Sequence, residues 1–224
     1  MRRKSSGTAD ILAEAGVEPA PERRRQRTWK QFLRSHAETL YACDFFGVEV
    51  LSLFGTVRNL VFFVMQVKSR AVRIAGVRIA PDGACMQLAR NLLDPEDGFL
   101  RESSYLIHDR DPFFTAAWTA TFKTAGVACL PIPAQSPNCN AHAERFVRTV
   151  RTECLNHFVI FGERPLRHVL REFSEHYLTE RHHRGIGGRI IQPKAWPSND
   201  NGKLGGIERR SRLGGLLNPY RRAA

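Results

Sequence analysis

The fold is decided by residues 41–79, which read YACDFFGVEV-LSLFGTVRNL-VFFVMQVKSR-AVRIAGVRI. This stretch holds three runs rich in Val, Ile and aromatic residues, the residue types that β-strands favour. The runs are 41–50, 57–67 and 71–79. Phe54-Gly55 and Lys68-Ser69 separate them and supply the turns. Because both turns are short, the pattern predicts an antiparallel meander of three strands.

Downstream of the meander, apolar residues switch between helical and strand spacing. The predicted helices are 81–93, 113–125, 141–158 and 166–177, and the predicted strands are 104–107 and 127–130. Asp111-Pro112 is expected to cap the helix over 113–125, and Gly126 to end it. The order β-β-β-α-β-α-β-α-α therefore predicts an α/β fold, with helices flanking a five-stranded mixed sheet.

The two ends of the chain differ in composition from its centre. Residues 1–36 hold nine Arg or Lys against four Asp or Glu, and residues 164–224 hold thirteen against five. We expect a basic N-terminal arm over 1–36, a central core domain over 37–197, and a basic, Gly-rich tail over 198–224. Within the arm, 8–16 is expected to be one short helix, and 29–40 a second, amphipathic helix. Such basic segments suit contact with a phosphate backbone.

The net charge of the chain indicates which kind of partner it binds. The net charge is +12 and the pI about 10.2, which favours nucleic acid first and an anionic membrane surface second. No apolar run approaches the ~18 residues of a membrane span. The five cysteines include no C-x-x-C pair, so neither a zinc site nor a disulfide framework is indicated. We expect a cytoplasmic protein without a membrane partner.

Two aspartates stand where strands meet solvent or a ligand. Asp44 lies within the apolar run over 41–46, where an unpartnered carboxylate would cost several kcal/mol. Asp109 follows the apolar strand over 104–107, and ligands gather at the carboxyl ends of strands in α/β sheets. Asp44 could instead be a water-facing strand end, and Asp109 a helix cap. Asp111 fits that cap better, which leaves Asp109 for other chemistry.

Glu144 supplies a third carboxylate, in the first turns of the helix expected over 141–158. Arg148 and Arg151 follow at +4 and +7, on the same helical face. Alone, this spacing indicates an ordinary surface ion pair. Together with Asp44 and Asp109 it indicates a site for divalent cations, because two-metal phosphoryl transfer needs several hard oxygen ligands that converge.

Three stretches carry a resemblance to a known family. They are Cys43-Asp44-Phe45-Phe46, the run LIHDRD over 106–111, and the run SPNCNAHAERFVRTVRTECL over 136–155. The sequence resembles the integrase catalytic core shared by bacterial insertion-sequence transposases and retroviral integrases, over about residues 28–195. The separation of 35 positions between Asp109 and Glu144 is close to the spacing of the family's second and third acids.

The resemblance implies a ribonuclease H-like fold and a DDE-type polynucleotidyl transferase that cuts and joins DNA at mobile-element ends. Asp44 and Asp109 would bridge two Mg²⁺ or Mn²⁺ ions, and Glu144 would complete one ion's shell. The partners would be the DNA of the element ends and of the target, with the chain a homo-oligomer on DNA. No covalent protein–DNA intermediate is expected.

Six side chains near Glu144 are candidates for DNA contact. They are Asn138, Asn140, His142, Arg145, Arg148 and Arg151. The two asparagines could instead serve loop and cap chemistry, and His142 and His108 could be polar surface residues. The stretch over 181–184, which reads RHHR, is a further candidate DNA-facing segment.

The chain departs from the family pattern at three places. Phe113 and Gln135 stand where relatives often carry a polar residue and an Arg, and both changes are expected to weaken DNA contact. The N-terminal DNA-binding region is expected to be a remnant of a helix-turn-helix over 1–36. These departures leave open a catalytically inactive or truncated DNA-binding remnant. The same residues also fit a ribonuclease H-like nuclease without strand transfer, or a basic protein that only coats nucleic acid.

Overall fold

The computed structural model describes most of the chain. The described ranges are 31–77, 84–100, 102–132, 140–194 and 206–222. Contacts divide the chain into two units, Met1–Ala37 and Glu38–Ala224. In the first unit, residues 31–35 are helical. The rest of the expected arm, including the helix over 8–16, lies outside the described residues, as does the boundary expected at 197/198.

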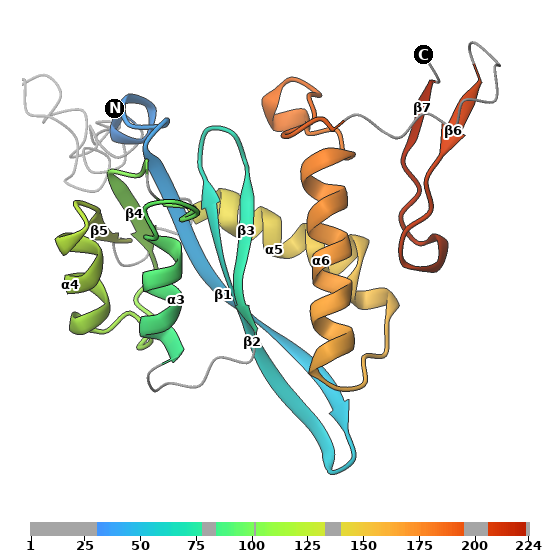
Figure 1. Cartoon of the computed structure of the whole chain (residues 1–224), viewed down its shortest axis with the longest axis horizontal. Coiled ribbons are helices and arrows are strands. Elements are labelled where there is room, and N and C mark those ends of the chain that lie inside the picture. Colours follow the sequence, from blue (N-terminus) through green and yellow to red (C-terminus); the bar gives the residue numbers. More distant parts are fainter. Residues whose placement is uncertain (1–30, 78–83, 101, 133–139, 195–205, 223–224) are drawn as a thin grey trace, which may run out of the picture. The chain divides into compact units, whose positions relative to one another are not determined.

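The second unit is built on a five-stranded sheet (Figure 1). Its strands are β1 (Leu40–Ser52), β2 (Gly55–Gln66), β3 (Val72–Val77), β4 (Tyr105–His108) and β5 (Ala128–Pro131), in the order β3-β2-β1-β4-β5. Strands β1, β2 and β3 are antiparallel neighbours, whereas β4 runs parallel to β1 and β5 runs parallel to β4. The predicted antiparallel meander and five-stranded mixed sheet are thereby confirmed.

Four α-helices and a second, small sheet accompany the five-stranded sheet in the described part of the second unit, besides short 3₁₀ turns. The helices are α3 (Ala84–Leu92), α4 (Ala116–Thr124), α5 (Ala141–Glu153) and α6 (Glu163–Thr179), and the small sheet pairs β6 (Ile207–Arg209) with β7 (Tyr220–Arg222). The antiparallel pairing of β6 with β7 gives the tail the form of a hairpin.

Strand alternation divides the core into two clusters, one on each face of the sheet. From β1, Phe46 packs with side chains of α5 and α6, including Phe146 and Phe173. Cys43, of opposite parity, packs with Trp118 and other side chains of α3 and α4. Helices α5 and α6 therefore cover one face of the sheet, and α3 and α4 cover the other (Figure 1).

Three predicted boundaries were wrong. The expected helix over 29–40 cannot reach Leu40, which is buried and begins β1. Helix α4 begins at Ala116, because the Thr115 hydroxyl caps it by accepting a hydrogen bond from the Trp118 amide at 3.2 Å. Helix α5 ends at Glu153 rather than 158, where a short 3₁₀ turn over Leu155–His157 follows.

The C-terminal hairpin is anchored to α6 by a buried arginine. The Arg212 guanidinium donates to both oxygens of Glu180, at 2.8–3.1 Å, and to Glu172 at 2.8 Å. The side chains of Arg212 and Glu180 are only 5% and 1% exposed. Leu217 joins the apolar cluster beneath α5 and α6. Residues of the tail thus contribute to the same core as the sheet.

The cysteines and the helices bear on the expectations about disulfides and membrane spans. Cys43, Cys129 and Cys154 carry free thiols, and burial raises the pKa of the last two to about 12, so both thiols are unreactive. Among the helices of the described ranges, none combines the length and the apolar character needed to cross a bilayer.

Candidate catalytic carboxylate site

The parallel pairing of β1 with β4 aligns Asp44 with Asp109. Ala42 is the register partner of Ile107, and each aspartate lies two residues further along its strand direction. Neighbouring strands are about 4.8 Å apart, so the two positions are adjacent across the sheet. Asp109 lies just beyond the last residue of β4, at the carboxyl end of the strand, as the sequence predicted.

Both aspartates belong to the sheet face that α5 covers. Asp44 shares its parity in β1 with Phe46, whose side chain packs in the cluster of α5 and α6. The residue before Asp109, His108, shares its parity with Leu106, which packs in the opposite cluster. The strand alternation therefore directs Asp109 to the same face as Asp44.

Helix α5 brings Glu144 to this face. Ala143, Phe146 and Val150 form its buried stripe, and Glu144 lies beside that stripe on an exposed position. Asn140, at the N-cap of α5, is 5% exposed, and its amide nitrogen lies 3.5 Å from the Cys43 carbonyl. Arg151 donates to the Gly47 carbonyl at 2.8 Å. These two contacts hold α5 along β1 on both sides of Glu144.

The electrostatics of Asp44 show that the carboxylates interact. Burial raises the pKa of Asp44 to about 7, and the charges of Asp109, Glu144 and Asp111 contribute to the rise. A hydrogen bond from the Phe45 amide at 2.7 Å opposes these effects. The structure thus places Asp109, Glu144 and Asp111 near enough to Asp44 for their charges to raise its pKa.

The donor set suits a divalent cation, although its side chains are not arranged around one. Among the described residues, no group of three or more His, Cys, Asp or Glu side chains that could hold a metal ion is found. Oδ1 of Asp44 accepts from the Phe45 amide, and Oδ1 of Asp109 accepts from the Asp111 amide at 3.1 Å. From described residues, neither Oδ2 receives a hydrogen bond, which leaves one oxygen of each carboxylate for a cation.

The region after β4 corrects two predictions. Asp111 does not cap α4; its Oδ1 instead accepts from the Phe113 amide at 2.9 Å, in a turn that precedes the helix. His108 is not a surface residue, because it is 5% exposed and its ring lies 4.6 Å from Phe114 and 5.8 Å from Trp118. The burial of His108 could have been predicted from the alternation of side chains along the strand. His108 lies two residues after Leu106 and so points to the face that α4 covers.

Phe113, one of the departures from the family pattern, packs 5.0 Å from Phe45 and joins the apolar cluster of α3 and α4. Here it acts as a core residue.

The residues expected to contact DNA divide between two faces of α5. Arg148 is exposed on the face of Glu144, together with Arg151. His142 and Arg145 lie on a neighbouring face and line a separate cavity. Burial, then the charges of Arg70 and Arg145, lowers the pKa of His142 to about 4, so its imidazole is neutral near pH 7. Asn138 and Gln135 lie outside the described residues.

The fold is similar to that of a known integrase core. A five-stranded mixed sheet with two helices on each face, in this strand order, is the ribonuclease H-like fold that integrase catalytic cores share. Residues 125–190 match the family model described as Integrase core domain. This segment contains Glu144 and the basic residues of α5, so the resemblance seen in the sequence is confirmed there.

Solved structures agree on the fold at low sequence identity. The HTLV-2 integrase catalytic core domain in complex with magnesium is similar with a TM-score of 0.51 and 8% identity, over 69% of this chain and 93% of that chain. The BIV integrase catalytic core domain gives 0.48 and 16%, over 69% and 91%. The catalytic domain of Mos1 mariner transposase gives 0.49 and 16%, over 70% and 83%. The fold assignment rests on the first of these. No curated protein matches the sequence.

Proposed function

We propose that the chain is a metal-dependent DNA strand transferase, which cuts DNA at mobile-element ends and joins the ends to target DNA. Asp44, Asp109 and Glu144 are its metal-binding carboxylates. A further part of the proposal is that the chain works as a homo-oligomer on DNA, because joining two element ends to one target requires at least two active sites.

One observation carries the proposal. Asp109, at the end of β4, and Glu144, in the first turns of α5, lie near enough to Asp44 on β1 for their charges to add to the rise that burial causes in the pKa of Asp44. Clustering like charges at one place destabilises a fold unless a cation neutralises them. A cluster held by three separate elements is therefore a binding feature rather than a stabilising one.

In this proposal, Asp44, Asp109 and Glu144 would hold two Mg²⁺ or Mn²⁺ ions. When bound, the ions supply activation of the attacking water or DNA 3′-hydroxyl and stabilise the leaving oxygen. Asn140 and Arg151 are positioning residues, since each joins α5 to a backbone carbonyl of β1. Arg148, which has no ion pair with a described residue, is available to a DNA phosphate beside the carboxylates.

The experiment is a joining assay with Mg²⁺ or Mn²⁺ on DNA that carries candidate element ends, some of them pre-cut to expose a 3′-hydroxyl. Wild type is compared with Glu144→Gln and with Glu49→Gln, an exposed acid on β1 as a matched control. We expect wild type and Glu49→Gln to join the pre-cut end, and Glu144→Gln to bind DNA but to lose joining by at least 100-fold, about 2.7 kcal/mol.

Two results would count against the proposal. Hydrolysis without joining of the pre-cut end would make the chain a nuclease. Equal activity of Glu144→Gln and Glu49→Gln would remove Glu144 from the catalytic set.

A further inference from the structure

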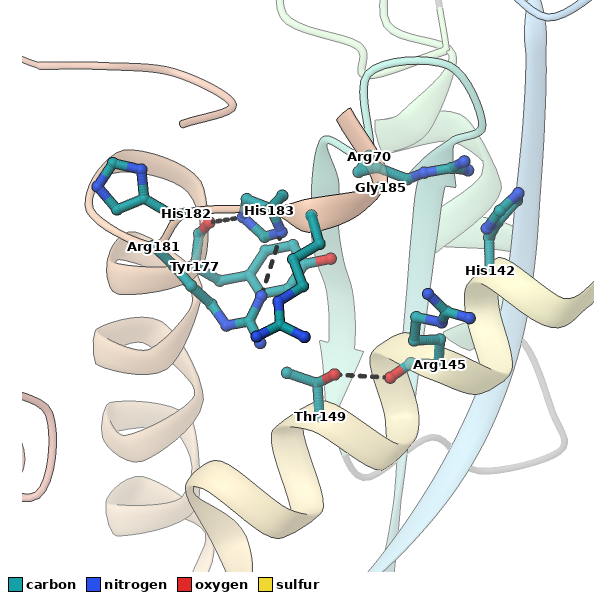
Figure 2. Close-up of a pocket in the computed structure, with 10 residues that line it drawn as sticks. Arg70, His142, Arg145, Thr149, Tyr177, Arg181, His182, His183 and Gly185 are labelled. Carbon is teal, nitrogen blue, oxygen red and sulfur yellow. Dashed lines mark hydrogen bonds between the residues drawn. The ribbon is translucent and has the colours of Figure 1, made fainter. Parts of the chain in front are cut away.

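A separate site, lined by cationic side chains, lies on the face of α5 next to the one that carries Glu144. It is a cavity of about 270 Å³ between α5, the end of α6 and the turn that joins β2 to β3. Its side chains come from the turn (Arg70), from α5 (His142, Arg145, Thr149), and from α6 and the residues after it (Tyr177, Arg181, His182, His183, Arg184). Figure 2 shows Arg145 between His142 on one side and Tyr177, Arg181 and His183 on the other, with Arg70 beside His142.

Most of the positive charge in this cavity has no described acid beside it. Among the described residues that line it, four are Arg and none is Asp or Glu. Arg181 is neutralised, because it forms two hydrogen bonds with Glu153 at 2.5 and 2.8 Å. Arg70, Arg145 and Arg184 form no ion pair with a described carboxylate. Three guanidinium groups therefore share one cavity without an anion.

Arg70 is held in place despite this repulsion. Its φ of 66° is in the left-handed region, which costs a non-glycine residue on the order of 1 kcal/mol. The turn fixes this conformation through hydrogen bonds from the Arg70 amide to the Gln66 carbonyl and from the Arg70 guanidinium to the Val67 carbonyl. Burial lowers the pKa of Arg70, and the charge of Arg145 lowers it further, against an opposing effect of Tyr177.

The cavity also has the size and the neutral donors that an oxyanion needs. Its volume is about nine times the ~30 Å³ that one water molecule occupies in the liquid. The Thr149 hydroxyl lines it and can donate to an anion by leaving the Arg145 carbonyl, 2.8 Å away. Planar guanidinium groups that line one cavity can donate hydrogen bonds to the oxygens of a phosphate group.

We propose that this cavity binds a phosphate group of the DNA backbone, at a point separate from the phosphate at the carboxylates. This inference rests on the proposed function, since it assigns a second contact for the same DNA. Arg145 and Thr149 lie about 100–140° around α5 from Glu144. The reacting phosphate therefore lies at one face of α5 and a second phosphate lies at another. Two contacts to the same helix fix the orientation of the DNA strand.

The test measures DNA affinity of the full chain without metal, as a function of salt. Proteins in which a contact to one phosphate is lost show a slope of log K against log salt that is shallower by about 1. We expect Arg145→Gln and Arg184→Gln each to reduce the slope by about 1 and to weaken binding at low salt about tenfold. Arg90→Gln is the charge-matched control, because Arg90 is exposed on α3, which covers the opposite face of the sheet.

Equal slopes and affinities for Arg145→Gln, Arg184→Gln and Arg90→Gln would overturn the inference. That result would leave the proposed function intact if wild type still joins DNA ends and Glu144→Gln does not. Conversely, slopes reduced by the cavity variants would support the inference even if wild type joined nothing. Melting temperatures of the variants close to that of wild type show that an affinity change is not caused by unfolding.

Inorganic phosphate distinguishes the source of the ligand. If the cavity serves free phosphate, millimolar phosphate at constant ionic strength raises the melting temperature of wild type but not of Arg145→Gln, while DNA affinity is equal for both. That combination would also overturn the assignment to the DNA backbone. If the cavity serves DNA, phosphate competes weakly with DNA in wild type and less in the variants.

Discussion

The charge of Asp44 is expected to affect the stability of the metal-free protein. Its pKa rises from 3.8 to about 7 on folding, first because it is buried and then because of its acidic neighbours. Between pH 4 and 7, the folded protein keeps a proton that the unfolded chain releases. The free energy of unfolding therefore falls as pH rises through this window and levels off above pH 7. The full loss is up to about 4 kcal/mol at about 1.4 kcal/mol per pKa unit.

Asp44→Asn is expected to raise the melting temperature of the metal-free protein at pH 8, because it removes a buried charge that has no counter-ion. At pH 4.5, where Asp44 is protonated when folded, the substitution is expected to have a much smaller effect. Scanning calorimetry at the two pH values measures both. A lower melting temperature for the variant at pH 8 would mean that a partner already neutralises Asp44.

The surroundings of His108 and Arg70 could not be predicted from the residues beside them in the sequence. His108 adjoins a predicted catalytic acid, yet strand parity places it between Phe114 and Trp118. Arg70 is one basic residue in a short turn, and only the packing of α5 and α6 against that turn makes it part of a cavity. By contrast, Asp44, Asp109 and Glu144 could be located from the sequence, because they stand in a strand, after a strand and in the first turn of a helix, and the structure has those elements there. Their role in metal binding stays a prediction.

At the scale of elements, the β1–β2 hairpin combines the best-buried and the most exposed apolar residues. Phe63 is fully buried and packs 4.8 Å from Phe146 and 5.9 Å from Phe46. Phe54, at the far end of the same hairpin, is 100% exposed. Figure 1 shows this end projecting beyond the other strands of the sheet. Only the tip of the hairpin is unpacked, because Leu51, just before it, forms backbone hydrogen bonds with Ile160 and Gly162.

Phe63→Ala is expected to lower the free energy of unfolding by about 3–5 kcal/mol, through lost burial and the cavity left behind. Phe54→Ala is the matched control and is expected to change it by less than about 0.5 kcal/mol. Urea unfolding followed by fluorescence provides both values. Equal effects of the two substitutions would contradict the packing of β2 against α5.

Substitution of Arg212 tests how the C-terminal hairpin is anchored to α6. Arg212→Met is expected to cost about 3–5 kcal/mol, because it leaves Glu180 buried without its main partner. Arg210→Met, at a half-exposed arginine 3.4 Å from Glu180, is expected to cost less than about 1 kcal/mol. Limited proteolysis would show earlier cleavage near residues 207–222 in Arg212→Met. Unchanged cleavage would mean that apolar contacts alone anchor the hairpin.

The sequence predicted the kinds of elements better than their ends. The strands β1 to β3 were predictable because their Val, Ile and aromatic runs are separated by turn residues. The start of α4 was not, since Asp111-Pro112 and Thr115 both offer a cap and only the structure shows that Thr115 makes it. The end of α5 was missed because apolar residues continue past Glu153 at helical spacing, although the chain turns there.

At the scale of the whole molecule, charge supports a nucleic acid partner. The chain carries a net charge of +12, and α5 presents basic side chains on two faces. We expect metal-free protein to bind duplex DNA of any sequence, with an affinity that falls about 100-fold or more between 50 and 200 mM salt, as about four phosphate contacts require. Fluorescence anisotropy measures this dependence. A salt-independent affinity would exclude backbone contact as the main source of binding.

The most direct test of the carboxylate site is a calorimetric titration of the DNA-free protein with Mn²⁺ at pH 8. We predict that wild type and Glu49→Gln bind Mn²⁺ with equal affinity. Asp44→Asn, Asp109→Asn and Glu144→Gln are each expected to bind it at least about tenfold more weakly, since each removes one oxygen donor. Equal Mn²⁺ affinity in all five proteins, or no binding to wild type, would contradict a metal site built from these three carboxylates.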